Sequence, residues 1–267
     1  MCVHGAALAG YLRDIWKHRH VVRHFVYTNL RSGNRDKLLG NLWSLLDPLL
    51  MMLVFFVVFG VLLRRGVDPI EYLPFLLVGI VAWRFSQTVA TGAGNSLRGA
   101  RGLVHEIAFP KAAIPVSVVL ARGYDFMCGL LILAVMLIIL GSGFKLSILW
   151  LPLVILVHSL FNLGVALLFS VIGAFFADIS NVLSFVYRLL FYLSPVFYEI
   201  SLVPEKLQPI YMINPYSALI EAYRDVLLRG LAPDPVYFGY AAGLSLALCI
   251  LGILIFNRAE GVIAKYV

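Results

Sequence analysis

The sequence predicts an all-α membrane protein with six transmembrane helices, an N-terminal amphipathic interface helix, and re-entrant helices between spans five and six. Two observations carry this prediction. Of 267 residues, 61% are hydrophobic and 13% are charged, whereas soluble domains carry about 25% charged residues. The apolar residues also gather in runs of roughly 20, the length that crosses a bilayer as a helix. A soluble fold could not cover this apolar surface, and the chain is expected to form one membrane domain.

Residues 1–41 are expected to form a cytoplasmic amphipathic helix followed by a basic loop. Over Tyr11 to Leu30 the sequence places basic and apolar residues on opposite sides of a helix: Arg13, Lys17, His20, His24 and Arg31 against Leu8, Leu12, Ile15, Val22 and Val26. That pattern is typical of a helix lying on a membrane surface, and it also fits a helix docked on a partner protein. No cleavable signal peptide precedes it, so the first span is expected to direct insertion.

Six apolar segments follow as predicted spans, at about 42–63, 73–91, 114–140, 148–176, 182–198 and 236–256, within a transmembrane domain of residues 42–256. The first carries Asp47 and Pro48 near its start. Arg84 interrupts the second span, and Arg188 interrupts the fifth, which Pro195 stops. A charged cytoplasmic tail is expected over 257–267.

The segment 199–233 is semi-polar and contains Pro204, Pro209 and Pro215. Its apolar run, from Leu207 to Ile220, is too short and broken to cross a bilayer. Non-spanning segments at membrane depth survive only against protein or water. We therefore expect short re-entrant helices here.

Lys and Arg counts orient the six spans. The side that holds both termini carries 12 of these residues and the other side carries 6. Because cytoplasmic loops are enriched in Lys and Arg, both termini are expected in the cytoplasm, with the protein a multi-pass component of the cytoplasmic membrane.

Several chemistries have no signature in this sequence. There is no GxxxxGK[ST] phosphate loop, no HExxH and no GxSxG, so ATP binding would need another polypeptide. Cys2, Cys128 and Cys249 lack metal-site spacing and are interpreted as free thiols rather than metal ligands or a disulfide.

A basic rim precedes the first span, where residues 31–50 read RSGNRDKLLGNLWSLLDPLL. Arg31, Arg35 and Lys37 stand where an anionic lipid head group would lie. They are equally typical of flanking positive charges that set topology. Leu39 and Gly40 form the junction, and Trp43 follows at interfacial depth.

Three motifs carry a resemblance to a known family. They are Leu-Gly-x-x-Trp followed by a proline, Ser194-Pro195 followed by an aromatic residue, and Asn214-Pro215 followed by Arg224. In this order and spacing the chain resembles the permease subunits of ABC-2 type polysaccharide exporters, which carry O-antigen, capsule or teichoic acid. Asn34, Lys37 and Ala177 depart from the usual residues of that family.

The resemblance implies a homodimer that pairs with two copies of a separate ATPase, which holds ATP and Mg²⁺, so that this chain needs no cofactor and is not an enzyme. It implies a lipid-linked, anionic glycan as substrate and a pyrophosphate contact at Leu39 and Gly40, with Arg35 and Lys37 nearby. By the same resemblance, the polar segment from Asn95 to Lys111 is expected to be a loop that couples the permease to the ATPase. Its candidate contact residues are Arg98, Arg101, His105, Glu106 and Lys111. A solvated cytoplasmic loop is the alternative.

The resemblance also implies a translocation path between two copies of spans one, two and five, with the candidates Trp83, Arg84, Arg188, Tyr192, Tyr198 and Arg224. Intramembrane charges are functional candidates by default. Arg84 either reaches the interface or faces the path. The aromatic residues around Arg188 also fit core packing, and Arg224 also fits an ion cluster with Glu221 and Asp225. Arg122 and Asp125, three residues apart, are expected to pair with each other.

Rival functions remain open at this point. A drug or small-lipid exporter of the same family would share the layout. A membrane enzyme acting on polyprenyl phosphates would need clustered acids for Mg²⁺, and no DDxxD pattern occurs. A passive channel would not need the long basic coupling loop.

Overall fold

A computed structural model describes residues 17–32, 42–62, 68–106, 109–141 and 145–266. Over these ranges the chain forms helices and short connections and contains no strand, in agreement with the all-α prediction. In chain order the helices are α2 (Arg19–Ser32), α3 (Leu42–Phe55), η1 (Phe56–Leu62), α4 (Pro69–Gly99), α5 (Arg101–Glu106), α6 (Ala113–Ile139), η2 (Leu146–Trp150), α7 (Leu151–Phe175), α8 (Ile179–Leu193), η3 (Ile200–Leu202), α9 (Gln208–Ile213), α10 (Pro215–Arg224), η4 (Asp225–Arg229) and α11 (Pro235–Tyr266).

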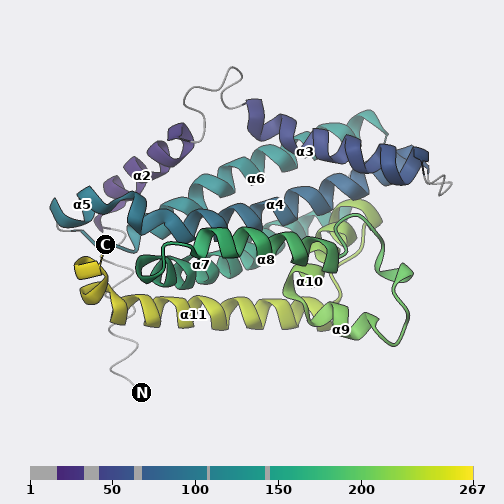
Figure 1. Cartoon of the computed structure of the whole chain (residues 1–267). Coiled ribbons are helices and arrows are strands. Elements are labelled where there is room, and N and C mark those ends of the chain that lie inside the picture. The colour runs from purple at the N-terminus through teal and green to yellow at the C-terminus, as the bar shows by residue number, and fades with distance from the viewer. Residues whose placement is uncertain (1–16, 33–41, 63–67, 107–108, 142–144, 267) are drawn as a thin grey trace.

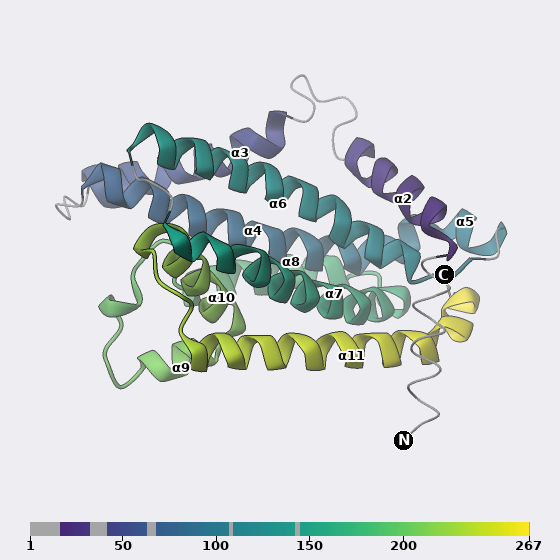
Figure 2. The same cartoon turned by 180° about the vertical axis from the view of Figure 1, so that it is seen from behind.

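The long helices run side by side in one bundle, with α3 and α6 on the side opposite α11 (Figure 1). Helices α2 and α5 lie at the end of the bundle that also holds the C-terminal turns of α11, whereas α9 and α10 lie at the other end (Figures 1 and 2). These two ends are called the α5 end and the α9 end below.

Four helical stretches are long and apolar enough to cross a membrane, and they lie at predicted spans two, three, four and six: Ile70–Gly99, Ala113–Ile139, Leu146–Phe175 and Pro235–Ile263. Two shorter apolar stretches, Leu46–Leu62 and Ile179–Leu193, lie at predicted spans one and five. Helix α8 ends at Leu193 because the residue before Pro195 is forced into extended backbone. Its 15 residues reach about 22 Å, less than the roughly 30 Å of a bilayer core.

Helix α4 is the centre of the bundle. Of its most apolar window 78% is buried, against 22% for α6 and 28% for α11. Leu76, Leu77 and Val89 are fully buried in the main hydrophobic core, which also includes residues of α6, α7, α8 and α10. The outer helices α6 and α11 therefore present most of their apolar surface outward, as lipid-facing helices do.

Two glycines of α7 allow close helix crossings. A Cβ at Gly173 would overlap the carbonyl oxygen of Gly94 on α4, and a Cβ at Gly164 would collide with the backbone at Leu248 on α11. Small residues at such crossings let helix backbones approach closely, which is how helices associate in membranes.

The N-terminal amphipathic helix is present as α2, and its residues before 17 lie outside the described ranges. Val22 and Phe25 are buried in a second core with Phe109 and residues of α6, α7 and α11. Asn29 Nδ2 donates a hydrogen bond to Ser117 Oγ of α6 at 3.0 Å. The apolar face of α2 is thus covered by this chain, and its basic face is exposed.

Of the segment predicted as a cytoplasmic tail, 257–267, the described residues 257–266 are helical. Helix α11 continues without a break from Pro235 to Tyr266. Phe256 and Ile263 are buried in the second core, and this packing supports the helix beyond the end of its apolar stretch. Cys128 and Cys249 are free thiols, and Cys2 lies outside the described residues.

Candidate functional site

Helices α3, α4 and α8 enclose an open groove of about 560 Å³. It is lined by Asp47, Leu50, Met51, Val54, Ile80, Trp83, Arg84, Gln87, Arg188, Phe191 and Tyr192. The structure therefore brings together four of the six predicted path residues, from two helices that are far apart in the sequence. We call this feature the α3–α4–α8 groove.

An ion pair joins α3 to α4 in the lining of this groove. Arg84 Nη2 donates to Asp47 Oδ2 at 2.5 Å, over a separation of 37 residues. The two side chains remain 38% and 40% exposed, because they face the groove rather than the core. Arg84 thus lines the groove and is held by a partner that the sequence analysis noted only as an acid within span one.

Arg188 lies on the α8 side of the groove and is exposed. Among the residues that the structure describes, it makes no ion pair. The charged groups that line the groove are therefore two guanidinium groups and one carboxylate. This leaves an excess of one positive charge, which favours an anionic ligand.

Aromatic rings form the floor of the groove. Trp83 packs edge-on against Phe191, with ring centroids 5.9 Å apart, and against Tyr216 of α10 at 5.2 Å. Tyr187 and Phe191 are buried, as the core-packing interpretation expects, whereas Tyr192 is exposed. Tyr192 is therefore the aromatic side chain of α8 that a ligand in the groove can reach.

The remaining two path candidates lie near the α9 end. Arg224 is fully buried, donates to Glu221 Oε1 at 2.7 Å and to the carbonyl of Val196 at 2.9 Å, and covers the ring of Phe75 at 3.5 Å. Burial lowers the pKa of the Arg224 guanidinium to about 10, and Glu221 opposes that shift, so the group stays charged at neutral pH. These contacts tie α10 to α4 and to the turn after α8.

Tyr198 follows α8 in that turn and is half-buried. Its hydroxyl donates to the carbonyl of Tyr192 at 3.3 Å, and its ring packs edge-on against Phe197 at 5.1 Å. Burial raises the pKa of the Tyr198 hydroxyl. The residue lies beyond the groove lining, at the α9 end.

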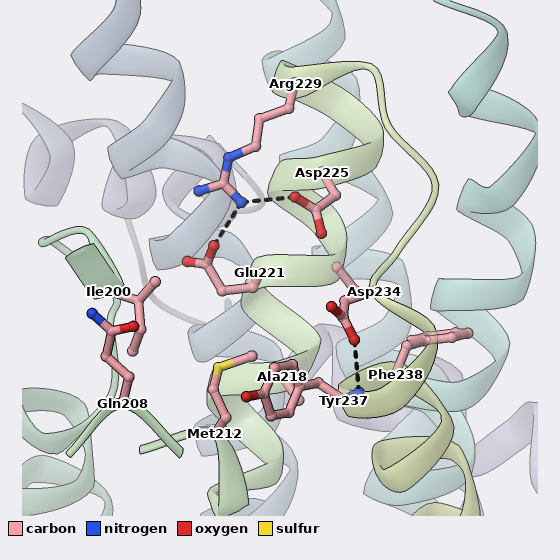
Figure 3. Close-up of a pocket in the computed structure, with 11 residues that line it drawn as sticks. Ile200, Gln208, Met212, Ala218, Glu221, Asp225, Arg229, Asp234, Tyr237 and Phe238 are labelled. Atoms are coloured by element: carbon pink, nitrogen blue, oxygen red, sulfur yellow. Dashed lines mark hydrogen bonds and ion pairs between the residues drawn. The ribbon is translucent and has the colours of Figure 1, made fainter. Parts of the chain in front are cut away.

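A smaller pocket of about 260 Å³ lies between α10, α9 and the start of α11 (Figure 3). Arg229 Nη1 bridges Glu221 and Asp225, at 2.7 Å to each carboxylate (Figure 3). Asp234 caps α11 by accepting from the backbone of Val236 at 2.9 Å. Arg229 thus pairs with two carboxylates of this pocket. Glu221, Arg224 and Asp225 do belong to one ion cluster, in which Arg224 pairs with Glu221 and Asp225 pairs with Arg229.

At the α5 end, the predicted coupling residues have different surroundings. Arg98 donates to the carbonyls of Gly173 and Ala174 at 2.7 and 3.2 Å, and so caps the C-terminus of α7. The backbone N–H of Lys111 donates to Glu260 Oε1 at 2.6 Å. Arg101 is exposed on α5, and the side chains of His105 and Glu106 lie outside the described part.

Most of the predicted head-group entrance, Arg35, Lys37, Leu39 and Gly40, lies outside the described residues. Arg31 lies in the last turn of α2 with an exposed side chain, and its guanidinium covers the ring of Tyr27 at 4.4 Å. Trp43 is half-buried at the start of α3.

An ion pair on α6 and the hydrogen-bonding contacts of a buried histidine on α7 also lie outside the groove lining. Arg122 and Asp125 pair at 3.2 Å along α6, as their spacing predicts. His158 is not among the sequence-predicted candidates. It is buried in α7 and shares a hydrogen bond of 2.7 Å with the hydroxyl of Ser86 of α4. Its other ring nitrogen lies 3.3 Å from the hydroxyl of Tyr223 of α10. The signal available in the sequence was a histidine within an apolar stretch that contains no charged residue.

Comparison with known proteins identifies similar chains over most of the length. A family model described as ABC-2 type transporter matches residues 22–228. The O-antigen export system permease protein RfbA of Klebsiella pneumoniae is 30% identical over 239 residues, which cover 88% of this chain and 91% of that protein.

More distant similarity extends to other relatives. The O-antigen export system permease protein RfbA of Myxococcus xanthus is 26% identical over 84% of this chain and 86% of its own length. The polysialic acid transport protein KpsM of Escherichia coli is 21% identical over 83% of this chain and 86% of its own length.

Proposed function

This chain belongs to the ABC-2 type transporter family, and from that premise we propose that it is the permease subunit of an ATP-driven exporter. Its cargo is a lipid-linked polysaccharide, O-antigen-like or another anionic glycan, which crosses the cytoplasmic membrane. The chain is a transport subunit rather than an enzyme, and ATP with Mg²⁺ is bound by a separate ATPase subunit.

The α3–α4–α8 groove is the observation that supports this substrate class. It combines an excess positive charge from Arg84 and Arg188 with an exposed aromatic ring, Tyr192. Guanidinium groups bind phosphate oxygens, and aromatic faces pack against sugars. Relatives that cover most of this chain are named as O-antigen export permeases and a polysialic acid transport protein, in agreement with such a cargo.

The proposed topology has six spans, with α3 and α8 as the first and fifth. Both are shorter than the other four, and charged or polar residues at their ends would lie at the interface. Helices α9 and α10 form the re-entrant pair, supported by the complete burial of α10 from Tyr216 to Arg224. The Lys and Arg distribution supports cytoplasmic termini, and in the proposed topology the α5 end, which holds the C-terminal turns of α11, faces the cytoplasm.

The proposed assembly contains two copies of this chain and two copies of the ATPase. Helix α5 and its connections, from Asn95 to Lys111, form the surface that meets the ATPase. The capping of α7 by Arg98 and the bond from Lys111 to Glu260 support a rigid mechanical link from this loop to α7 and α11. A movement of the ATPase would thus be transmitted through these contacts to α7 and α11.

The lipid head group is proposed to enter at the basic rim that precedes span one, along Arg31, Arg35 and Lys37, with Leu39, Gly40 and Trp43 at the junction to span one. The exposure of Arg31 and the basic outer face of α2 support a cationic surface there, which would attract an anionic head group. A drug or small-lipid exporter of the same family is the alternative function, and a neutral cargo would leave the cations of the groove without a role.

Deletion of the gene tests the proposed function. Surface polysaccharide should disappear and lipid-linked polymer should accumulate inside the cell, and expression of the wild-type chain should restore export. A matched control is a chain whose exposed Gly243, with no atom within 4 Å of its Cβ position, is changed to Ala. Unchanged surface polysaccharide in the deletion strain would refute the proposal.

A further inference from the structure

We propose that Asp47 is a built-in counter-anion of the α3–α4–α8 groove, which a phosphate group of the carried lipid displaces from Arg84, while Arg188 binds the same phosphate group from α8. Asp47 would thereby set how strongly the groove binds its anionic cargo. The identification of that cargo as a lipid-linked glycan rests on the proposed function.

The charge of the groove favours one added anion. Arg84 and Arg188 face the groove from different helices, and Asp47 neutralises only one of them. A phosphate that binds both guanidinium groups makes charge-assisted hydrogen bonds, which are stronger than those between neutral groups. The planar guanidinium matches phosphate geometry, and both arginines line the same groove of about 560 Å³, so the proposal assigns one phosphate group to both.

The Asp47–Arg84 pair is placed so that it can exchange partners. Both side chains are more than one-third exposed, and ion pairs with such exposure contribute little net stability. The contrasting case in this chain is Arg224 with Glu221, whose side chains are 0% and 7% exposed. Opening that buried pair would leave a carboxylate without solvent, whereas Asp47 can turn toward the groove opening.

The remainder of the groove fits the lipid part of such a molecule. Leu50, Met51 and Val54 follow Asp47 on the same groove wall and are exposed. At 1.5 Å per residue, Val54 lies about 10 Å along the helix from Asp47. The groove therefore has a charged part and an adjoining apolar strip, the arrangement that a phosphate joined to a polyprenyl chain requires.

The test uses the reconstituted complex of permease and ATPase, with ATPase stimulation titrated against a long-chain polyprenyl diphosphate. Asp47→Asn should lower the half-saturating lipid concentration by about fivefold, the upper range expected when an exposed ion pair is removed. Arg84→Gln and Arg188→Gln should raise it, with the maximal stimulated rate less affected. The effect of Asp47→Asn should vanish in the Arg84→Gln background, because Asp47 acts through Arg84.

Asp125→Asn is the matched control. It makes the same chemical change in an ion pair of similar exposure, 30% for Arg122 and 27% for Asp125, outside the groove lining. Its half-saturating concentration should equal that of the wild type. Circular dichroism melting of each variant separates a loss of lipid affinity from a loss of folding.

Two further probes show which parts of the lipid diphosphate the groove recognises. Inorganic pyrophosphate should compete only weakly, and a neutral polyprenol should not stimulate. Equal potency of pyrophosphate or of the polyprenol would overturn the proposal. So would an Arg188→Gln variant that changes the oligomeric state and leaves the half-saturating lipid concentration unchanged, since Arg188 would then contact the second copy rather than the lipid.

The two proposals fail in different ways. If the wild-type complex does not respond to the lipid diphosphate and the deletion strain still exports polysaccharide, the proposed function is wrong. If the wild type responds but Asp47→Asn and Asp125→Asn have the same half-saturating concentration, only the counter-anion role of Asp47 is wrong.

Discussion

Replacement of Arg224 by Met should destabilise the protein strongly, because this guanidinium joins three parts of the fold. It is fully buried and donates to Glu221 and to the Val196 carbonyl, while it covers the ring of Phe75. Met fills a similar volume but removes the charge and both hydrogen bonds. Helix α10 would then lose its polar attachment to the turn after α8.

The magnitude follows from what the substitution leaves behind. Removing one partner of a buried ion pair costs about 3–5 kcal/mol, because the other charge stays buried without compensation. Here Glu221 keeps a second partner, Arg229, at 2.7 Å, so the lower limit of about 3 kcal/mol applies. For a chain of this size that corresponds to a fall in Tm of roughly 6–12 °C.

Circular dichroism melting of the detergent-purified permease measures this change. Arg188→Met is the matched control, because it makes the same substitution at an exposed arginine that has no ion pair in the described part of the chain. Its Tm should stay within about 2 °C of the wild type, as surface substitutions usually cost under 0.5 kcal/mol. If the Tm of Arg224→Met equals that of Arg188→Met, the buried ion cluster does not hold α10 in place.

Three other experiments test the helix crossing, the α5 end and the basic rim. Gly173→Ala should cost about 1–3 kcal/mol in thermal melting because its Cβ would overlap a backbone carbonyl of α4, whereas Gly99→Ala, with open space around it, should be neutral or slightly stabilising. Glu260→Ala removes the acceptor of the Lys111 amide, and hydrogen exchange at that amide should speed up by about fivefold, as expected for a bond worth about 1 kcal/mol; an unchanged rate would contradict the bond. Charge reversal of Arg35 and Lys37 should reduce glycan-stimulated ATPase activity while the complex still assembles, and unchanged stimulation would remove both residues from the entrance.

Much of the fold was predictable because the bilayer imposes it. Apolar runs long enough to cross a membrane locate the helices without any knowledge of their packing. The Arg122–Asp125 pair was predictable for a similar reason, since residues three apart on one helix face each other. The end of α8 near Pro195 and the start of α10 at Asn214-Pro215 also follow from local backbone chemistry.

The candidate site was predictable only in part. Trp83, Arg84, Arg188 and Tyr192 were candidates, and they do line one groove. Their shared location depends on how three helices pack. Helices that are apolar on nearly all sides carry little periodic signal for the face that each one buries.

The sequence by itself determined that this chain is a helical membrane protein, where its apolar helices lie, and which family it resembles. Only the tertiary structure decided that Arg84 pairs with Asp47, that Arg98 caps α7 and that Glu260 holds the amide of Lys111. The physical reason is distance along the chain. Local spacing specifies contacts within one or two helical turns, whereas these pairs are 37, 75 and 149 residues apart and form only once the helices have packed.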